Sequence, residues 1–589
     1  MTADDPMGRR TQESSSAGVQ FSEPFLTVSP PPSGEVSDSL STRRRRSSSR
    51  TKILAPQEYA RAVRGYSRLR SGAGQNHIAL GEFLTTEPPS SFNITFGTDQ
   101  VNKSFVTLYR LGSPDHAGRK HEHASSDEGE QGNQSSRGNK AHHFEDPQIL
   151  YDFSRPCLDK PQSCIVFLRG YMTPAWLNNI GAKYVVDPEF FCRHLDFRPP
   201  DDNSNNFSIP ALPSSSWHLI ELPLLTIGTR DIPKGATRPD IIEDLRTKGS
   251  RALAEHHHRI SRLSSSGMSV GDSLVRDFHV FDETHFAIEQ RISICMQEAG
   301  HAFSLLIWLD SGKDFNESSG GPWSPTPPKS HLLPVIRHKP MVALKCHLLS
   351  DETYTPQTQS ASLLHVDYGR SLRSSIMAAD PFYALNEIFS FAASSEMYFL
   401  NLIDIKLDKY TGPNAHELNS LPNLKYTKEI LYRHIQKIQR ILISIHNAQH
   451  FKWPRAGSDG GRKGRATAAA EGLEQDFSHL LNRAQTLHTR CNEAITVLMS
   501  SISISESTKA IDQGRRVAKL TFLAFIFVPL SFTTSFFGMN VKEFEANNIS
   551  IYYWVACSIP VMIMAFLLLA YDITRPFRIL YRYIRTLFY

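Results

Sequence analysis

The sequence predicts an α+β membrane protein with a cytosolic α/β domain, a long helical stalk and two C-terminal transmembrane helices. Residues 520–541 and 546–571 contain no Asp, Glu, Lys or Arg. Short runs rich in Val, Ile and Phe, bounded by Gly, Pro and Asp, fill residues 148–350 and are typical of strands. From residue 380 onward, apolar residues recur at helical spacing up to the first charge-free stretch. These three patterns define the predicted fold class.

The two charge-free stretches are long enough to cross a membrane. The first apolar run, 520–537, spans roughly 27 Å as a helix, which is close to the hydrocarbon thickness of a bilayer. Basic residues lie before the first stretch and after the second, so the positive-inside rule places both termini in the cytosol. We predict a multi-pass membrane protein. We assign it to the plasma membrane because we recognise no organelle-targeting signal in the sequence. The alternative is a buried hairpin in a soluble core, but two such runs rarely share one soluble hairpin.

Composition changes along the chain divide it into segments. The predicted segments are a disordered Ser/Arg-rich tail (1–55), the cytosolic α/β domain (56–350) with a disordered His-rich insertion (112–145), a helical bundle and stalk (376–518), a first span (519–538), an outer loop (539–550), a second span (551–571) and a basic cytosolic tail (572–589). A His-rich loop can also bind metal weakly, and the triple histidine at 256–258 is interpreted in the same way as the insertion.

The composition also excludes several classes of protein. The net charge of +5 over 589 residues is small, so we expect no nucleic-acid partner. The seven cysteines form no CxxC pair, which argues against a zinc ribbon. The sequence has no Gly-rich phosphate loop, no G-x-S-x-G motif and no zinc-hydrolase helix. We therefore predict that the protein is not an enzyme and has no cofactor.

Individual strands and helices follow from the local patterns. Strands are predicted at Ser163–Leu168, Trp217–Leu225, Asp277–Val280, His285–Cys295, Ala302–Leu309 and Val342–Leu348. Helices are predicted at Ile180–Leu195, with a break at Asp187-Pro188, and at Asp380–Asp408 and Leu418–Lys452.

A heptad pattern follows these helices. Its apolar positions are Leu473, Phe477, Leu480, Ala484, Leu487, Cys491, Ala494 and Leu498. From Leu473 onward no helix breaker intervenes before Gly514, so we predict one helix from about Thr467 to Phe537, on the order of 100 Å long. The heptad face is predicted either to form a coiled coil or to pack against the two preceding helices, and both can hold.

The segment AKLTFLAFIFVPLSFTTSFFGMNV, which ends at Val541, resembles the first transmembrane helix and signature of the CorA family of magnesium channels. The resemblance rests on Leu520-Thr521, Pro529-Leu530 and the triplet Gly538-Met539-Asn540, and a second span and short basic tail also match. Residues 168–197 are similar to the family's N-terminal strand–helix element and look like its divergent fungal branch. The resemblance implies a funnel-shaped homopentamer in a lipid bilayer, with five first-span helices lining a pore.

One face of the first span has the character of a pore lining. Its residues step by three and four, and they are Val517, Leu520, Ala524, Val528, Ser531 and Ser535. This face is small or weakly polar, whereas phenylalanines occupy the other faces. We predict that it lines the pore, with Val517 and Leu520 as a hydrophobic gate. The alternative is that small residues only let helices pack closely.

The triplet at 538–540 is the predicted selectivity filter. Mg²⁺ sheds water reluctantly, so a ring of neutral Asn540 carbonyls would hold a hydrated ion by hydrogen bonds to its waters. Gly538 is predicted to enter positive φ and aim Asn540 inward, with Met539 packing to fix the turn. Glu543 and Glu545 are predicted to form an outer acidic ring that concentrates cations.

We therefore predict a divalent cation channel, with Mg²⁺ as transported ion and possible regulator. Acidic candidates for a regulatory site are Asp272, Asp277, Asp282, Glu283 and Asp404, but no spacing singles one out. One alternative is a transporter of Zn²⁺ or another divalent cation with the same fold. The other is a membrane-anchored scaffold that conducts nothing.

Overall fold

The structure is a computed structural model. It describes residues 54–69, 74–86, 104–112, 141–153, 162–197, 212, 215–231, 240–261, 268–299, 302–318, 320–323, 330–336, 360–366, 368–412, 417–450, 453–456, 460–539 and 551–570. The predicted strand at Val342–Leu348, most of the N-terminal tail and the C-terminal basic tail lie outside these ranges.

The strands of the described residues form one mixed sheet. They are β1 (Val106–Arg110), β2 (Ala141–Phe144), β3 (Cys164–Arg169), β4 (Leu219–Arg230), β5 (Asp277–Val280), β6 (His285–Ala299), β7 (Ala302–Leu309) and β8 (Ser330–Leu332). The order is β2-β1-β3-β7-β6-β4-β8, and β5 also pairs with β6. Within this described sheet, β3 and β7 are parallel and the other pairs are antiparallel.

Strand β7 lies in the centre of the sheet and is buried on both faces. Leu305 and Ile307 belong to one hydrophobic core, whereas Leu306 and Trp308 belong to a second core on the other face. This division follows from the two-residue period of a strand. A strand covered on both faces reads as a continuous apolar run, which is why its two ends were predictable from the sequence.

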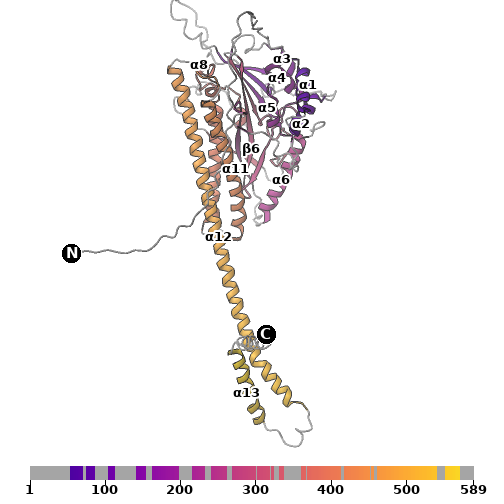
Figure 1. The fold of residues 1–589 in the computed structure, drawn as a ribbon, viewed down its shortest axis with the longest axis vertical. Coiled ribbons are helices and arrows are strands. Elements are labelled where there is room, and N and C mark those ends of the chain that lie inside the picture. Colours follow the sequence, from indigo (N-terminus) through magenta and orange to yellow (C-terminus); the bar gives the residue numbers. More distant parts are fainter. Residues whose placement is uncertain are drawn as a thin grey trace, which may run out of the picture. The chain divides into compact units, whose positions relative to one another are not determined.

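Short helices cover one face of the sheet (Figure 1). They are α1 (Pro56–Ser67), α2 (Gln75–Thr85), α3 (Pro147–Asp152), α4 (Pro174–Tyr184), α5 (Pro188–Leu195) and α6 (Asp240–Ser261). The break at Asp187-Pro188 is present as predicted. There, the Asp187 carboxylate accepts a hydrogen bond from the Glu189 N–H at 2.9 Å and caps α5.

Long helices cover the other face. The helical part contains α8 (Ser374–Met377), α9 (Pro381–Ala384), α10 (Asn386–Thr411), α11 (Glu417–His450), α12 (Gly460–Phe537) and α13 (Ile551–Ala570). Helix α12 runs as one 78-residue helix, as the sequence predicts (Figure 1). Its heptad residues from Leu473 to Cys491 are buried in one core with α10, α11 and the sheet. The heptad face therefore packs within the chain.

The structure corrects two predictions about histidine-rich segments where it describes them. Residues 113–140 of the predicted insertion lie outside the described residues, and that part stays a prediction. The predicted disordered insertion at 112–145 ends in β2, which pairs antiparallel with β1 and buries Phe144. The triple histidine at 256–258 lies inside α6, where His256 is buried and its Nε2 accepts the Val275 N–H at 3.3 Å. Both segments are polar in sequence, and pairing with a neighbouring element decides their structure.

Replacing Phe477 with alanine should strongly destabilise the bundle. The Phe477 side chain is 1% exposed, and its ring meets Phe389 edge to face with centroids 6.2 Å apart. Removing a buried aromatic ring costs about 3–5 kcal/mol because the cavity collapses only partly. The midpoint of thermal unfolding in detergent should fall well below that of a Tyr432→Ala control on the exposed side of α11. Equal midpoints for the two variants would contradict this packing.

Candidate functional site

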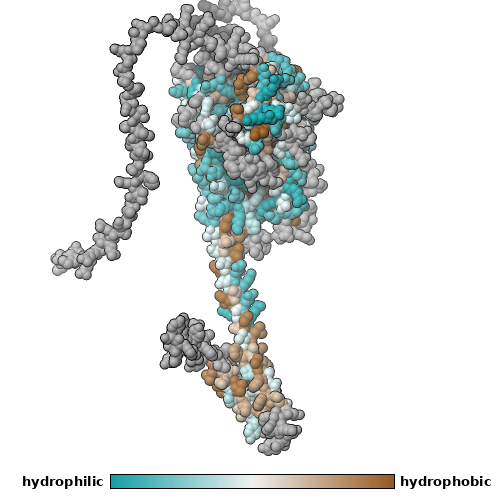
Figure 2. All heavy atoms as spheres, turned by 45° about the vertical axis from the view of Figure 1, so that its right-hand side comes forward, coloured by the Kyte–Doolittle hydropathy of each residue, from teal (hydrophilic) through white to brown (hydrophobic). Residues whose placement is uncertain are grey.

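The C-terminal part of α12 is the most apolar exposed surface of the described chain. Among the described residues, α12 is the one helix long and apolar enough to cross a membrane, and α13 offers a shorter apolar stretch at Ile551–Leu567. Figure 2 shows this hydrophobic surface over both helices. Side chains such as Leu520 and Val528 are 67% and 66% exposed, respectively. An apolar surface of this kind needs lipid or further protein around it.

Helix α13 covers one face of α12. The Ser558 hydroxyl donates a hydrogen bond to the Thr533 hydroxyl at 3.0 Å, and both residues are buried. Further along, the rings of Phe522 and Phe566 lie 5.9 Å apart. Hydroxyl pairs and aromatic contacts of this kind hold helices together where no water is available. These contacts define the face of α12 that packs on α13.

The predicted pore stripe lies on the opposite face. All six stripe residues are exposed in the single chain: Val517, Leu520, Ala524, Val528, Ser531 and Ser535. At about 100° per residue, Ala524 lies on the side of α12 opposite Thr533, and Ser531 and Ser535 lie close to the same side. The structure therefore leaves the weakly polar stripe free while α13 covers the other side.

At the end of α12 the structure corrects one prediction. The Gly538 N–H donates to the Thr534 carbonyl at 3.0 Å, which continues the helical pattern, and Gly538 is not among the glycines with positive φ. A side chain at this position would be tight, because a Cβ would lie 3.2 Å from the Thr534 carbonyl oxygen. Gly538 thus continues the hydrogen-bond pattern at the end of the helix rather than forming a left-handed turn. Met539 is 60% exposed.

The remaining members of the predicted filter fall outside the described residues. These are Asn540, Glu543 and Glu545, together with most of the predicted outer loop. Their roles stay predictions from the sequence.

Four of the acidic residues weighed as regulatory candidates have basic partners within the chain. Asp272 lies 3.0 Å from Lys313, Asp277 lies 3.0 Å from Arg433, and Asp282 lies 2.5 Å from Lys406. Asp404 lies 2.9 Å from Arg490. Burial alone would raise the pKa of Asp282, but the hydrogen bond and charge of Lys406 outweigh burial and hold that pKa well below its ordinary value. In the single chain, these four carboxylates are therefore paired with lysine or arginine side chains.

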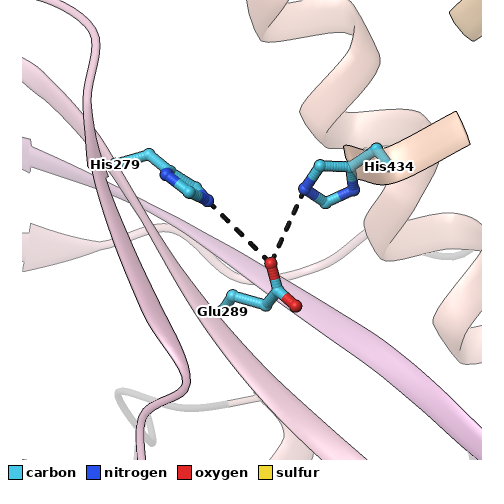
Figure 3. A group of neighbouring side chains, drawn as sticks. All are labelled: His279, Glu289 and His434. Carbon is cyan, nitrogen blue, oxygen red and sulfur yellow. Dashed lines mark ion pairs between the residues drawn. The ribbon is translucent and has the colours of Figure 1, made fainter. Parts of the chain in front are cut away.

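A different cluster gathers three ligand-type side chains in the interior (Figure 3). His279 on β5, Glu289 on β6 and His434 on α11 are buried, and one nitrogen or oxygen atom from each lies within 4.8 Å of the other two. The Nε2 atoms of His279 and His434 lie 3.9 and 3.6 Å from Oε2 of Glu289. Sequence reasoning missed this cluster, because no local spacing links the two strands to a helix far along the chain.

Comparison with known families identifies the class of the C-terminal part. Residues 415–575 match the model of the family described as CorA-like Mg²⁺ transporter protein. The match covers α11, α12, α13 and the segment that carries the Gly-Met-Asn triplet, so this part of the chain is similar to the CorA-like family. Together with the apolar length of α12, this similarity supports a membrane protein. No curated protein matched the chain.

Proposed function

We propose that the protein transports divalent cations across a membrane through a pore lined by α12 of a homopentamer, and that Mg²⁺ is the main ion transported. The CorA-like match over residues 415–575 supports divalent cation transport as the class of activity. The pentamer, the two spans and the cytosolic position of both termini are parts of this proposal. The second charge-free stretch and its basic flanks support the two spans and the position of the termini, and the resemblance of the first span to the CorA family supports the pentamer.

The observation that carries the pore assignment is the position of the stripe. Ala524, Ser531 and Ser535 face away from α13, on a surface that the single chain leaves exposed. Five copies arranged with α13 outside would bring these stripes together around one axis. Small and weakly polar side chains leave room there for a hydrated ion, whereas the phenylalanines of the other faces suit lipid and helix contacts.

The filter and gate complete the proposal. Asn540, three residues beyond the end of α12 at Phe537, would present a neutral carbonyl oxygen to the waters of a hydrated Mg²⁺ ion. Glu543 and Glu545 would raise the local cation concentration at the outer mouth. Val517 and Leu520 would narrow the inner end of the stripe, and their apolar side chains would close it by excluding water.

Flux measurements in liposomes test the transport class and the ion. The purified chain should pass Mg²⁺ down its gradient, with Zn²⁺ and Co²⁺ compared in parallel. Faster Zn²⁺ flux would assign the protein to zinc transport on the same fold. Absence of flux for all three ions would favour the scaffold.

Replacing Ala524 with tryptophan should block flux by filling the pore. The indole would project from the stripe into the space that five copies share. The matched control is Leu523→Trp, because Leu523 is the adjacent residue, is 49% exposed and lies about 100° away from the stripe. We expect Ala524→Trp to reduce Mg²⁺ flux by at least tenfold and Leu523→Trp to retain most of it. Equal flux in the two variants would remove the stripe from the pore.

A further inference from the structure

The cluster of His279, Glu289 and His434 has the spacing of metal ligands. Hydrogen bonds between nitrogen and oxygen require about 2.7–3.2 Å, and the two Nε2–Oε2 distances of 3.9 and 3.6 Å exceed this range. Ligand atoms around one Zn²⁺ ion, each about 2.0–2.2 Å from the metal, lie roughly 3.3 Å apart. The three atoms are therefore too far apart to bond one another and close to the separation at which they would share an ion.

Both histidines present a buried nitrogen that makes no hydrogen bond. The Nε2 atoms of His279 and His434 have no hydrogen-bond partner, and the side chains are 3% and 1% exposed. A buried polar atom without a partner destabilises a fold by about 1–3 kcal/mol. Two such atoms face the same carboxylate oxygen (Figure 3). A bound ion between the three side chains would give each of these atoms a partner.

Glu396 fixes how His434 presents its ring. Its Oε1 lies 2.9 Å from Nδ1 of His434, and a carboxylate oxygen accepts, so Nδ1 carries the proton. In the neutral ring Nε2 then has its lone pair directed toward Glu289. A lone pair facing a carboxylate oxygen is repulsive unless a positive centre lies between them. A carboxylate behind a histidine is also the arrangement that orients metal-binding imidazoles.

An ion pair between Lys437 and Glu289 is the competing explanation for a charged glutamate in this interior cluster. Its ammonium lies 2.5 Å from Oε1 and 2.7 Å from Oε2 of Glu289. Burial alone would raise the pKa of Glu289, but the charge of Lys437 more than offsets burial and keeps that pKa well below its ordinary value. An ion pair with Lys437 explains the charge of Glu289 but gives neither histidine nitrogen a hydrogen bond. Oδ2 of Asp277 lies 3.7 Å from Nε2 of His279, which is also beyond hydrogen-bond distance. The Lys437 side chain is 25% exposed, so it can keep Oε1 and release Oε2.

We propose that His279, Glu289 and His434 form a binding site for a divalent d-block cation, with Zn²⁺ as the best match. Two imidazoles and one carboxylate are a ligand set that Zn²⁺ accepts, with a fourth position left for water. Mg²⁺ prefers oxygen ligands and its own waters, so this site is distinct from the proposed transport path. Phe399 closes one side, with its ring centroid 4.6 Å from that of His434.

The position of the site gives the bound ion a consequence for the fold. It joins β5 and β6 of the sheet to α11, and α11 packs along α12. An ion held by all three ligands would fasten the sheet to the helices that continue into the apolar end of the chain. Zn²⁺ binding should therefore raise the thermal stability of the full chain.

The test measures metal retention in the purified full-length protein, independently of flux. His116, His121 and His123 are first replaced by Asn in every sample, so that these three histidines contribute no binding. After chelation, titration with Co²⁺ should give one equivalent per chain with the absorption bands of a low-coordinate site, and Zn²⁺ should displace it. His279→Gln and His434→Gln should each abolish these bands. His256→Gln, which changes another buried histidine, should leave them unchanged.

Two positioning variants separate a metal site from a structural ion network. Glu396→Gln keeps the three ligands and should weaken binding about 10- to 100-fold. Lys437→Met removes the competing ammonium and should tighten Co²⁺ and Zn²⁺ binding. An ion network without metal predicts no stoichiometric Co²⁺ in any variant, and that result would overturn the proposal.

Where the histidine variants do not fold, X-ray absorption at the zinc edge of the Zn²⁺-loaded parent protein decides. Two imidazole ligands would support the site, and a spectrum without imidazole would overturn it.

Discussion

Asn540→Ala is expected to reduce Mg²⁺ flux in liposomes to the background level while the oligomer stays intact. The amide oxygen is the group that would hold the waters of the hydrated ion, and alanine offers no acceptor in its place. The loss is expected to be larger than for any stripe variant, because a filter acts on every ion that passes. A Mg²⁺-sensitive dye inside the liposomes measures flux, and light scattering on the detergent complex measures the number of copies.

Asn548→Ala is the matched control for this experiment. It removes an amide from the same predicted outer loop, close to the second span, and should leave flux unchanged. Asn540→Asp should retain the cation but slow its exit, because a ring of carboxylates binds a divalent ion strongly. Unchanged flux in Asn540→Ala would exclude the filter assignment, and a monomeric wild-type protein would exclude the pentameric pore.

The parts of the fold that the sequence predicted well are those with a strong period. Strands β5 and β7 have the predicted ends, since β7 is a largely apolar run and β5 alternates polar and apolar residues, and both are bounded by turn residues. Helix α12 could be predicted as one continuous helix because its apolar positions keep a seven-residue pattern and no proline precedes the apolar stretch. In these segments the local pattern and the tertiary packing favour the same structure.

The parts that escaped prediction depend on partners distant in the chain. Strand β2 is polar and rich in histidine, and its pairing with β1 makes it a strand. Gly538 was assigned a left-handed turn on general grounds, whereas the backbone of α12 continues through its N–H. The three side chains at His279, Glu289 and His434 meet only because the sheet packs on α11. A periodic pattern in the sequence does not predict contacts between residues that are far apart in the chain.

The second prediction with a large expected effect is a loss of stability when the buried charge of Asp310 in the α/β domain is removed. Asp310 follows β7 and its side chain is fully buried. It accepts hydrogen bonds from Nε and Nη2 of Arg276 at 2.8 and 2.6 Å, and from the Arg291 N–H at 2.6 Å. Burial alone would raise the pKa of Asp310, but the charge of Arg276 more than offsets it and keeps that pKa below its ordinary value. This carboxylate is therefore ionised, and donors surround it.

Asp310→Asn should destabilise the domain by about 3–5 kcal/mol, because it leaves the partly buried Arg276 guanidinium without its counter-charge and turns an amide donor toward other donors. The control is Asp408→Asn, which breaks a surface ion pair with Arg490 and should cost about 0–1 kcal/mol. Denaturant unfolding followed by tryptophan fluorescence measures the free energy of unfolding of both variants.

The stabilising effect of Asp310 should also depend on pH. Since the folded pKa of Asp310 is depressed, its contribution to stability is complete above the unfolded carboxyl pKa of about 3.9 and is lost as the pH falls below it. The gap between wild type and Asp310→Asn should accordingly narrow in acid, and a gap no larger than that of the control at neutral pH would show that Asp310 does not stabilise the domain.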